Sequence, residues 1–184
     1  MTRILCIFLT LMLASTAVYA DKDQKKRDKI DKSASERLER LYEEQPATKA
    51  EVASAVGYAA FSNVGVNVVF FSAGGGTGVV VNAKSGDRTY MNMGSAGVGL
   101  GLGVKDFRAI FVFHKQSALD NFINSGWDFS GQADAAAKTT DRGGEASAAG
   151  TVVNGVSIYQ LTEAGLALQA TLQGTKYWKS DSLN

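Results

Sequence analysis

Glycine is distributed very unevenly along this 184-residue chain, and this distribution constrains the fold more than any other feature. All 20 glycines fall between Gly57 and Gly174, and none precedes Gly57. Glycine disfavours helices because it loses more backbone freedom on ordering than any other residue. The fold class that follows is α+β: N-terminal helices, then a glycine-rich antiparallel meander sheet with one inserted helix. A sheet of this kind can be open or closed into a barrel.

The first 20 residues have the pattern of a secretory signal peptide. Arg3 gives a basic start, an apolar run follows over residues 4–14, and small or short residues precede Ala20. The run is shorter than the roughly 20 apolar residues of a membrane-spanning helix. We therefore expect cleavage between Ala20 and Asp21 and an exported protein, periplasmic or secreted. Such a protein would contain no thiol, since Cys6 is the one cysteine of the chain.

Two helical stretches are expected between the signal peptide and the first glycine. Residues 21–35 are mostly charged and form a leader that we expect to be partly disordered. Apolar residues from Ile30 to Tyr42 recur at helical spacing, so this stripe would pack against the sheet or lie on a membrane. A second, alanine-rich helix after Pro46 is expected to end around Gly57. The domain proper is expected to comprise residues 36–184.

Five short apolar or alternating segments in the glycine-containing part are typical of antiparallel strands. They are residues 66–71, 79–81, 89–93, 98–104 and 107–113. The sequences AGGGTG, KSGD and GSAG and the pair Lys105-Asp106 lie between them and are interpreted as hairpin connections. Asn154-Gly155 is the strongest turn signal of the chain. A helix is predicted over KQSALDNFINSG, and a last strand is predicted over residues 166–172.

Composition and motifs argue against several classes of function. Lys plus Arg number 19 against 18 Asp plus Glu, which gives no electrostatic reason to expect nucleic-acid binding. One Cys and one His cannot form a Cys/His zinc site, and neither glycine-loop pattern for nucleotide phosphates occurs. His114 has no accompanying nucleophile motif, so we expect it to have a capping or surface role. We expect no enzyme activity, no metal and no cofactor.

Glycines alternate with apolar residues over positions 97–103, which would leave one face of a strand without side chains. We expect another element to pack closely against Gly99 and Gly101, or the strand to bend there. A ligand groove is the alternative.

Three segments resemble the SYLF domain. They are GYAAFSNVGVNVVFFSAGGGTGVVV, GSAGVGLGLGVKDFRAIFVFHKQSALDNFINSGW and VSIYQLTEAGLALQATLQGTKYW. The resemblance implies a lipid-binding module, which in eukaryotic members prefers anionic or phosphoinositide headgroups and in some cases also binds actin. Bacterial members are typically exported. This chain lacks the family's usual proline after Trp127, although it keeps Arg142, and it has no clear counterpart of the basic extension associated with actin. We therefore expect lipid binding without actin.

Four basic residues are the candidates for a lipid-binding site. Lys105 and Arg108 are interpreted as flanking a hairpin turn, Lys115 starts the inserted helix, and Arg142 lies in the following loop. The strand over residues 107–113 is expected to lie centrally and to hold these groups at one end. The expected partner is an anionic phospholipid or membrane surface. The alternative function is a protein-interaction or structural component of the cell envelope that does not bind lipid.

Overall fold

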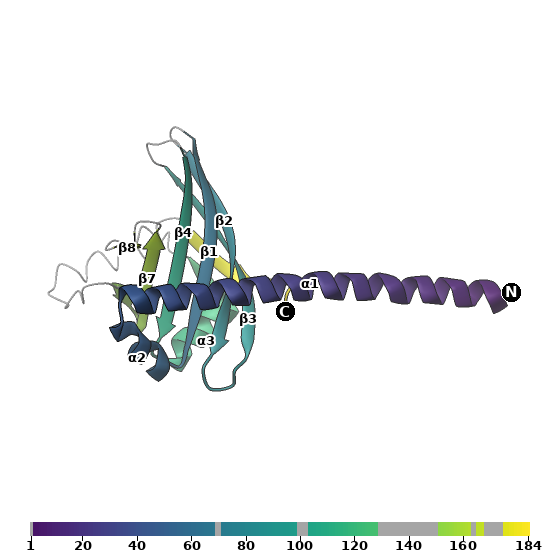
Figure 1. Cartoon of the computed structure of the whole chain (residues 1–184), viewed down its shortest axis with the longest axis horizontal. Helices are drawn as coiled ribbons and strands as arrows, with labels where there is room; N and C mark the ends of the chain where they lie inside the picture. The colour runs from purple at the N-terminus through teal and green to yellow at the C-terminus, as the bar shows by residue number, and fades with distance from the viewer. Residues whose placement is uncertain (1, 69–70, 99–102, 129–150, 163–164, 168–174) are drawn as a thin grey trace.

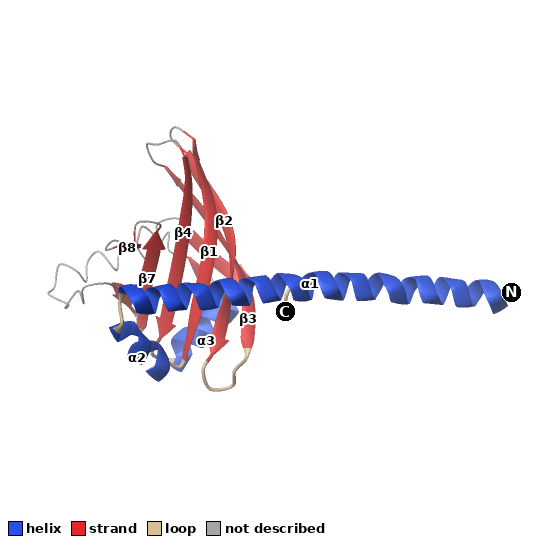
Figure 2. Ribbon diagram, viewed as in Figure 1, coloured by secondary structure: helices blue, strands red, loops and turns tan. Residues whose placement is uncertain are grey.

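One antiparallel sheet with helices on both faces forms the part of the chain that the computed structural model describes (Figures 1 and 2). That part comprises residues 2–68, 71–98, 103–128, 151–162, 165–167 and 175–184. This arrangement confirms the predicted α+β class. The residues Gly99, Gly101 and Arg142, on which we based expectations above, lie outside it.

Helix α1 (Thr2–Glu44) runs across the strands and continues well beyond the edge of the sheet toward the N-terminus (Figure 1). Residues 21–35, which we expected to be partly disordered, are helical in the structure. The sheet explains this difference, because Asp31 pairs with a strand residue and Ala34 is buried. Tertiary packing, more than the local sequence, stabilises helices of this kind.

Two shorter helices lie near one end of the sheet. Helix α2 (Ala47–Ser54) follows Pro46 directly. Helix α3 (Gln116–Ser125) is the predicted inserted helix, and it ends at Gly126, whose φ of 68° favours glycine.

In the described residues the sheet has nine strands, and all of their pairs are antiparallel. They are β1 (Gly57–Val68), β2 (Phe71–Asn82), β3 (Arg88–Val98), β4 (Gly103–Phe113), β5 (Trp127–Asp128), β6 (Thr151–Val153), β7 (Val156–Thr162), β8 (Gly165–Ala167) and β9 (Thr175–Lys179). Their order is β5-β9-β3-β2-β1-β4-β7-β6, with β8 also paired to β7. The described strands form an open sheet and not a closed barrel. Strand β4 lies centrally, between β1 and β7, as predicted for residues 107–113.

Each face of the sheet carries its own apolar core, because side chains alternate along every strand. Phe61 and Phe111 point to the face covered by α3, where they contact Phe122 and Tyr177 through their rings. Ile110 and neighbouring alternate residues point to the opposite face, which α1 covers. The three best-buried residues of α1 in this second core are Ala34, Leu38 and Leu41.

The glycine-rich sequence AGGGTG is part of β2 and does not form the hairpin connection that we expected. Strands β1 and β2 pair without interruption from Gly57 with Asn82 to Val68 with Phe71. A Cβ on Gly78 would lie 2.4 Å from the Phe61 ring, so this ring occupies the space that a side chain would need. Aromatic packing across the pair makes a glycine-rich strand feasible here.

Several other strand boundaries also differ from the predictions. GSAG lies inside β3, and the pair Lys105-Asp106 lies inside β4, because each strand pairs continuously with a neighbour at these positions. The expected strand over residues 66–71 is divided between β1 and β2. Strand β9 was not predicted. The two remaining turns are confirmed: Gly86 in KSGD has a φ of 76°, and Asn154 and Gly155 have φ values of 52° and 82°.

A candidate anion-binding groove between α1 and the sheet

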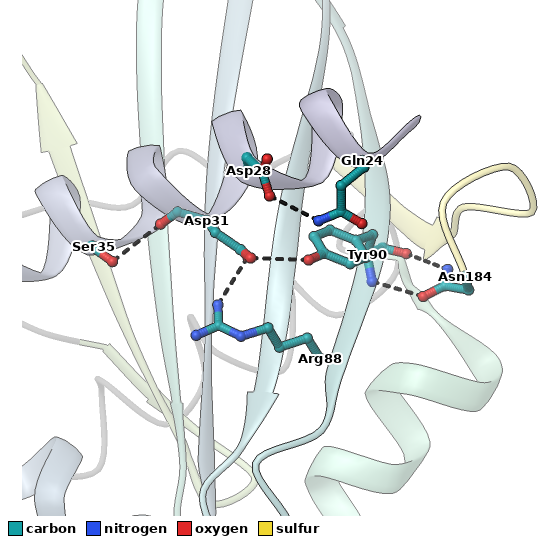
Figure 3. A network of polar contacts seen from close by, with 7 residues as sticks. All are labelled: Gln24, Asp28, Asp31, Ser35, Arg88, Tyr90 and Asn184. Carbon is teal, nitrogen blue, oxygen red and sulfur yellow. Dashed lines mark hydrogen bonds and ion pairs between the residues drawn. The ribbon is translucent and has the colours of Figure 1, made fainter. Parts of the chain in front are cut away.

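A network of polar contacts holds one side of α1 against β3 (Figure 3). The carboxylate of Asp31 lies 2.9 Å from the Arg88 guanidinium and accepts a hydrogen bond of 3.0 Å from the Tyr90 hydroxyl. The side chain of Asn184 bonds both the backbone N–H and the carbonyl of Tyr90, at 2.9 and 2.8 Å. Arg27 lies over the Tyr90 ring, 5.9 Å from its centroid. Burial first, and then the hydrogen bond to Asp31, raises the pKa of Tyr90 above its ordinary value.

On the side of α1 away from this network, a row of residues that are register partners on neighbouring strands crosses the sheet. Arg108 in β4 pairs with Ser62 in β1, Ser62 with Thr77 in β2, and Thr77 with Asn92 in β3. Ile110, two residues after Arg108, packs on the face that α1 covers. Because side chains alternate between faces, Arg108 and the rest of this row lie on the same face.

Two adjoining hollows lie between this row and α1. The first has a volume of about 200 Å³ and is lined by Lys29, Ile30, Ser33, Arg37, Ser62 and Thr77. The second has a volume of about 310 Å³ and is lined by Ser33, Glu36, Arg37, Arg40 and Arg108. Since they share Ser33 and Arg37, we treat them as one basic groove, defined by these nine residues.

The basic groove suits an anion with several oxygen atoms. Its described lining residues include four cationic side chains and one carboxylate, Glu36. Arginine presents planar donors that match phosphate oxygens in pairs, and serine and threonine hydroxyls can donate further hydrogen bonds. Arg40 also pairs with Glu44, at 2.9 Å between Nε and Oε1, which reduces the local positive charge. The described lining therefore holds more cations than carboxylates, with donors on both the helix and the sheet.

Of the four predicted lipid-binding residues, Arg108 lines the basic groove. Lys105 lies in the same strand, and the expectation that the two residues flank a hairpin turn is wrong, since β4 pairs with β1 over its whole length. Lys115 lies beyond the other end of β4, as the N-cap residue of α3. Ten residue-to-residue steps separate Lys105 from Lys115, a distance of roughly 33 Å in extended backbone. The structure therefore does not gather these residues at one end of β4, and Arg142 lies outside the described residues.

Sequence reasoning missed the contribution of α1 to this groove. Lys29, Ser33 and Arg37 follow one another at four-residue spacing, and Arg40 comes three residues later. Such spacing places all four on one side of a helix. This pattern could have identified the helix side of the groove, although only the fold shows that Arg108 faces it.

A second polar cluster surrounds His114 and ties α2 to the sheet. His114 Nε2 lies 2.8 Å from Ser157 Oγ and 3.1 Å from Glu51 Oε1, and Tyr159 donates a hydrogen bond to Glu51. In a catalytic triad the serine and the acid contact different ring nitrogens, whereas here both contact the same nitrogen. Ser157 is also only 3% exposed. This geometry provides no catalytic triad, and it explains why burial and the Glu51 contact raise the pKa of Tyr159.

Neither a metal-binding cluster nor a membrane-spanning helix occurs among the described residues. No three or more His, Cys, Asp or Glu side chains in this part of the chain are grouped so that they could hold a metal ion. No helix there combines the length and the apolar character needed to span a membrane.

The sequence of this chain is similar to a known family and to a known protein. Residues 94–184 match the Ysc84 family model, described as Las17-binding protein actin regulator. The chain is also 35% identical over 151 residues to Beta cell expansion factor A of Aeromonas veronii. This chain belongs to the SYLF family. The alignment with that relative covers 81% of this chain and 55% of the relative, so the SYLF chain described here spans about half of the relative's length.

SYLF domains are a family of non-catalytic binding domains, which agrees with the arrangement around His114. The family match includes Arg108 on the sheet side of the basic groove. It does not extend to the α1 residues Lys29, Arg37 and Arg40.

Proposed function

We propose that this SYLF chain is a non-enzymatic module that binds the headgroups of anionic phospholipids in the basic groove. The observation that carries the proposal is the convergence of Arg37, Arg40 and Arg108 on one hollow of about 310 Å³. Two of these residues come from α1 and one from β4, so a bound headgroup would bridge the helix and the sheet.

The chemistry of the groove favours a phosphate group held near a surface. Guanidinium groups bind phosphate oxygens in pairs, and hydroxyls from Ser33, Ser62 and Thr77 lie in the same groove. Each Lys or Arg near an anionic membrane surface contributes about 1 kcal/mol, and salt screens this attraction. Glu36 opposes part of it, so we expect moderate and strongly salt-dependent binding.

We also propose that the chain is exported to the cell envelope, periplasmic or secreted, after cleavage between Ala20 and Asp21. The basic start, the apolar run and the short residues before Ala20 support this proposal. The family description names regulation of actin, whereas an exported chain would encounter phospholipid headgroups and not actin.

Vesicle sedimentation tests the lipid-binding proposal. The protein isolated from the producing cell is mixed with phosphatidylcholine vesicles that contain or lack phosphatidylserine, at low and at raised salt. The groove variant combines Arg37→Gln, Arg40→Gln and Arg108→Gln. A matched control combines Lys49→Gln, Lys84→Gln and Lys115→Gln, three exposed residues outside the groove. This control also tests Lys115 as a lipid-binding residue.

We expect the wild-type protein and the control to pellet with the anionic vesicles and to be released by salt. The groove variant should bind on the order of 100-fold more weakly, since it loses three cations worth about 1 kcal/mol each. Circular dichroism and thermal melting confirm that each variant is folded. Equal binding by the groove variant and the control would remove the groove from the site. Failure of the wild-type protein to pellet with any vesicle would favour the protein-interaction alternative.

A further inference from the structure

Trp178 in β9 is an exposed aromatic side chain that neither core explains. It is 47% exposed and is one of two large hydrophobic residues that are strongly exposed in the described part of the chain. The other tryptophan, Trp127, packs against Phe111 and Phe122 in the core on the α3 face. Single exposed hydrophobic residues are common on protein surfaces, so the position of Trp178 in the sheet, and not its exposure alone, is the informative observation.

The register of the sheet places Trp178 in the same row as the basic groove. Trp178 pairs with Asn92 in β3. From Asn92 the row of paired residues continues through Thr77 and Ser62 to Arg108. Tyr90, two residues before Asn92, contacts Asp31 of α1, so Asn92 and Trp178 face the α1 side as well. Four steps between neighbouring strands separate Trp178 from Arg108, a distance of about 19 Å.

Two glycines beside this row, Gly94 and Gly75, leave space around the Trp178 ring. A Cβ on Gly94 would lie 3.2 Å from the ring, so the absence of a side chain lets the ring lie against the sheet. Gly75 pairs with Gly94, and a Cβ there would meet no atom within 4 Å. The α1 face thus carries the cations of the basic groove toward the Arg108 end of the row and an aromatic ring at the other end.

We propose that this face docks on the surface of an anionic bilayer, with Trp178 as an anchor in the interfacial region and the basic groove on the headgroups. The inference rests on the proposed function and adds the orientation of the domain and a second point of attachment. Tryptophan favours the membrane–water interface, because its ring is apolar and its N–H is polar. Peripheral attachment gains from combining electrostatic attraction with buried apolar area, and this face offers both.

Tryptophan fluorescence tests the anchor directly, since the chain contains two tryptophans. In the Trp127→Phe variant, all tryptophan emission comes from Trp178. Adding phosphatidylcholine vesicles that contain phosphatidylserine should shift this emission to the blue, and brominated acyl chains should quench it. Because Trp127 packs in the core, a second measurement subtracts the spectrum of the Trp178→Phe variant from that of the wild-type protein. The difference isolates Trp178 in a protein with an intact core.

Vesicle binding by Trp178→Ala should be about tenfold weaker than wild-type binding, which corresponds to about 1.4 kcal/mol. The matched control is Val152→Ala, which removes the other strongly exposed hydrophobic side chain, in β6 at the far end of the sheet. Its binding should be unchanged.

The outcomes separate this inference from the proposed function. Salt-dependent pelleting of the wild-type protein without any change in Trp178 emission would overturn the anchor and leave headgroup binding in the groove intact. Equal loss of binding in Trp178→Ala and Val152→Ala would also overturn it. Absence of vesicle binding by the wild-type protein would overturn both proposals.

Discussion

Leu41 offers a direct test of how firmly α1 is joined to the sheet. Its side chain is fully buried, at 0% exposure, in the core between α1 and the sheet. The change Leu41→Ala removes three carbon atoms. At about 0.8 kcal/mol for each buried CH₂ or similar group, the hydrophobic free energy lost is about 2.4 kcal/mol. The cavity left behind adds to this loss, so we expect a decrease of about 3 kcal/mol in the free energy of unfolding. For a chain of this size the melting temperature should fall by about 6 to 12 °C.

Urea denaturation followed by tryptophan fluorescence measures this change. Glu43→Ala is the control on the same helix, because Glu43 is exposed and its removal should change stability by less than about 0.5 kcal/mol. A Leu41→Ala variant as stable as the Glu43→Ala variant would refute the reasoning. It would mean that α1 is not part of the core, and that the helix side of the basic groove is not fixed.

Three further predictions concern processing, metal independence and alkaline pH. N-terminal sequencing of the protein from the producing cell should begin at Asp21, and recovery of intact Met1 in the membrane fraction would contradict the signal-peptide assignment. Chelator and reductant should leave the melting temperature unchanged, whereas a fall of several degrees with chelator would indicate an unrecognised carboxylate site for calcium. Burial raises the pKa values of Tyr90, Tyr159 and Tyr177, so the folded state holds these protons more tightly than the unfolded state does. These tyrosines should therefore leave the free energy of unfolding unchanged up to about pH 10 and lower it above that pH, and stability that rises above pH 10 would show that these pKa directions are wrong.

The sequence predicts the fold class and the inserted helix because their signals are local. Glycine is absent before Gly57, and an amphipathic pattern ends at Gly126, so these elements can be identified without knowledge of their neighbours. The apolar residues 107–113 also predict a central strand, since a strand covered on both faces needs apolar side chains on both.

The strand boundaries could not be predicted because they depend on partners distant in the sequence. AGGGTG has the composition of a turn, and only its pairing with β1 and β3 shows that it is a strand segment. The basic groove depends in the same way on register. Helix α2 and the whole of β1, β2 and β3 separate Arg37 from Arg108 in the sequence, and the two residues share a hollow only because α1 packs across the sheet.

The C-terminal strand β9 has a consequence for when the chain can fold. Tyr177 in β9 contacts Phe61 and Phe111 in the core, and the Leu183 carbonyl accepts a hydrogen bond from Arg27, 156 residues earlier. A nascent chain in which β9 has not yet emerged lacks these contacts, so its core stays incomplete until this strand is available. Contacts of such long sequence separation also form slowly. The topology thus makes completion of the core wait for β9, and a chain that ends before β9 lacks the Tyr177 contacts with Phe61 and Phe111.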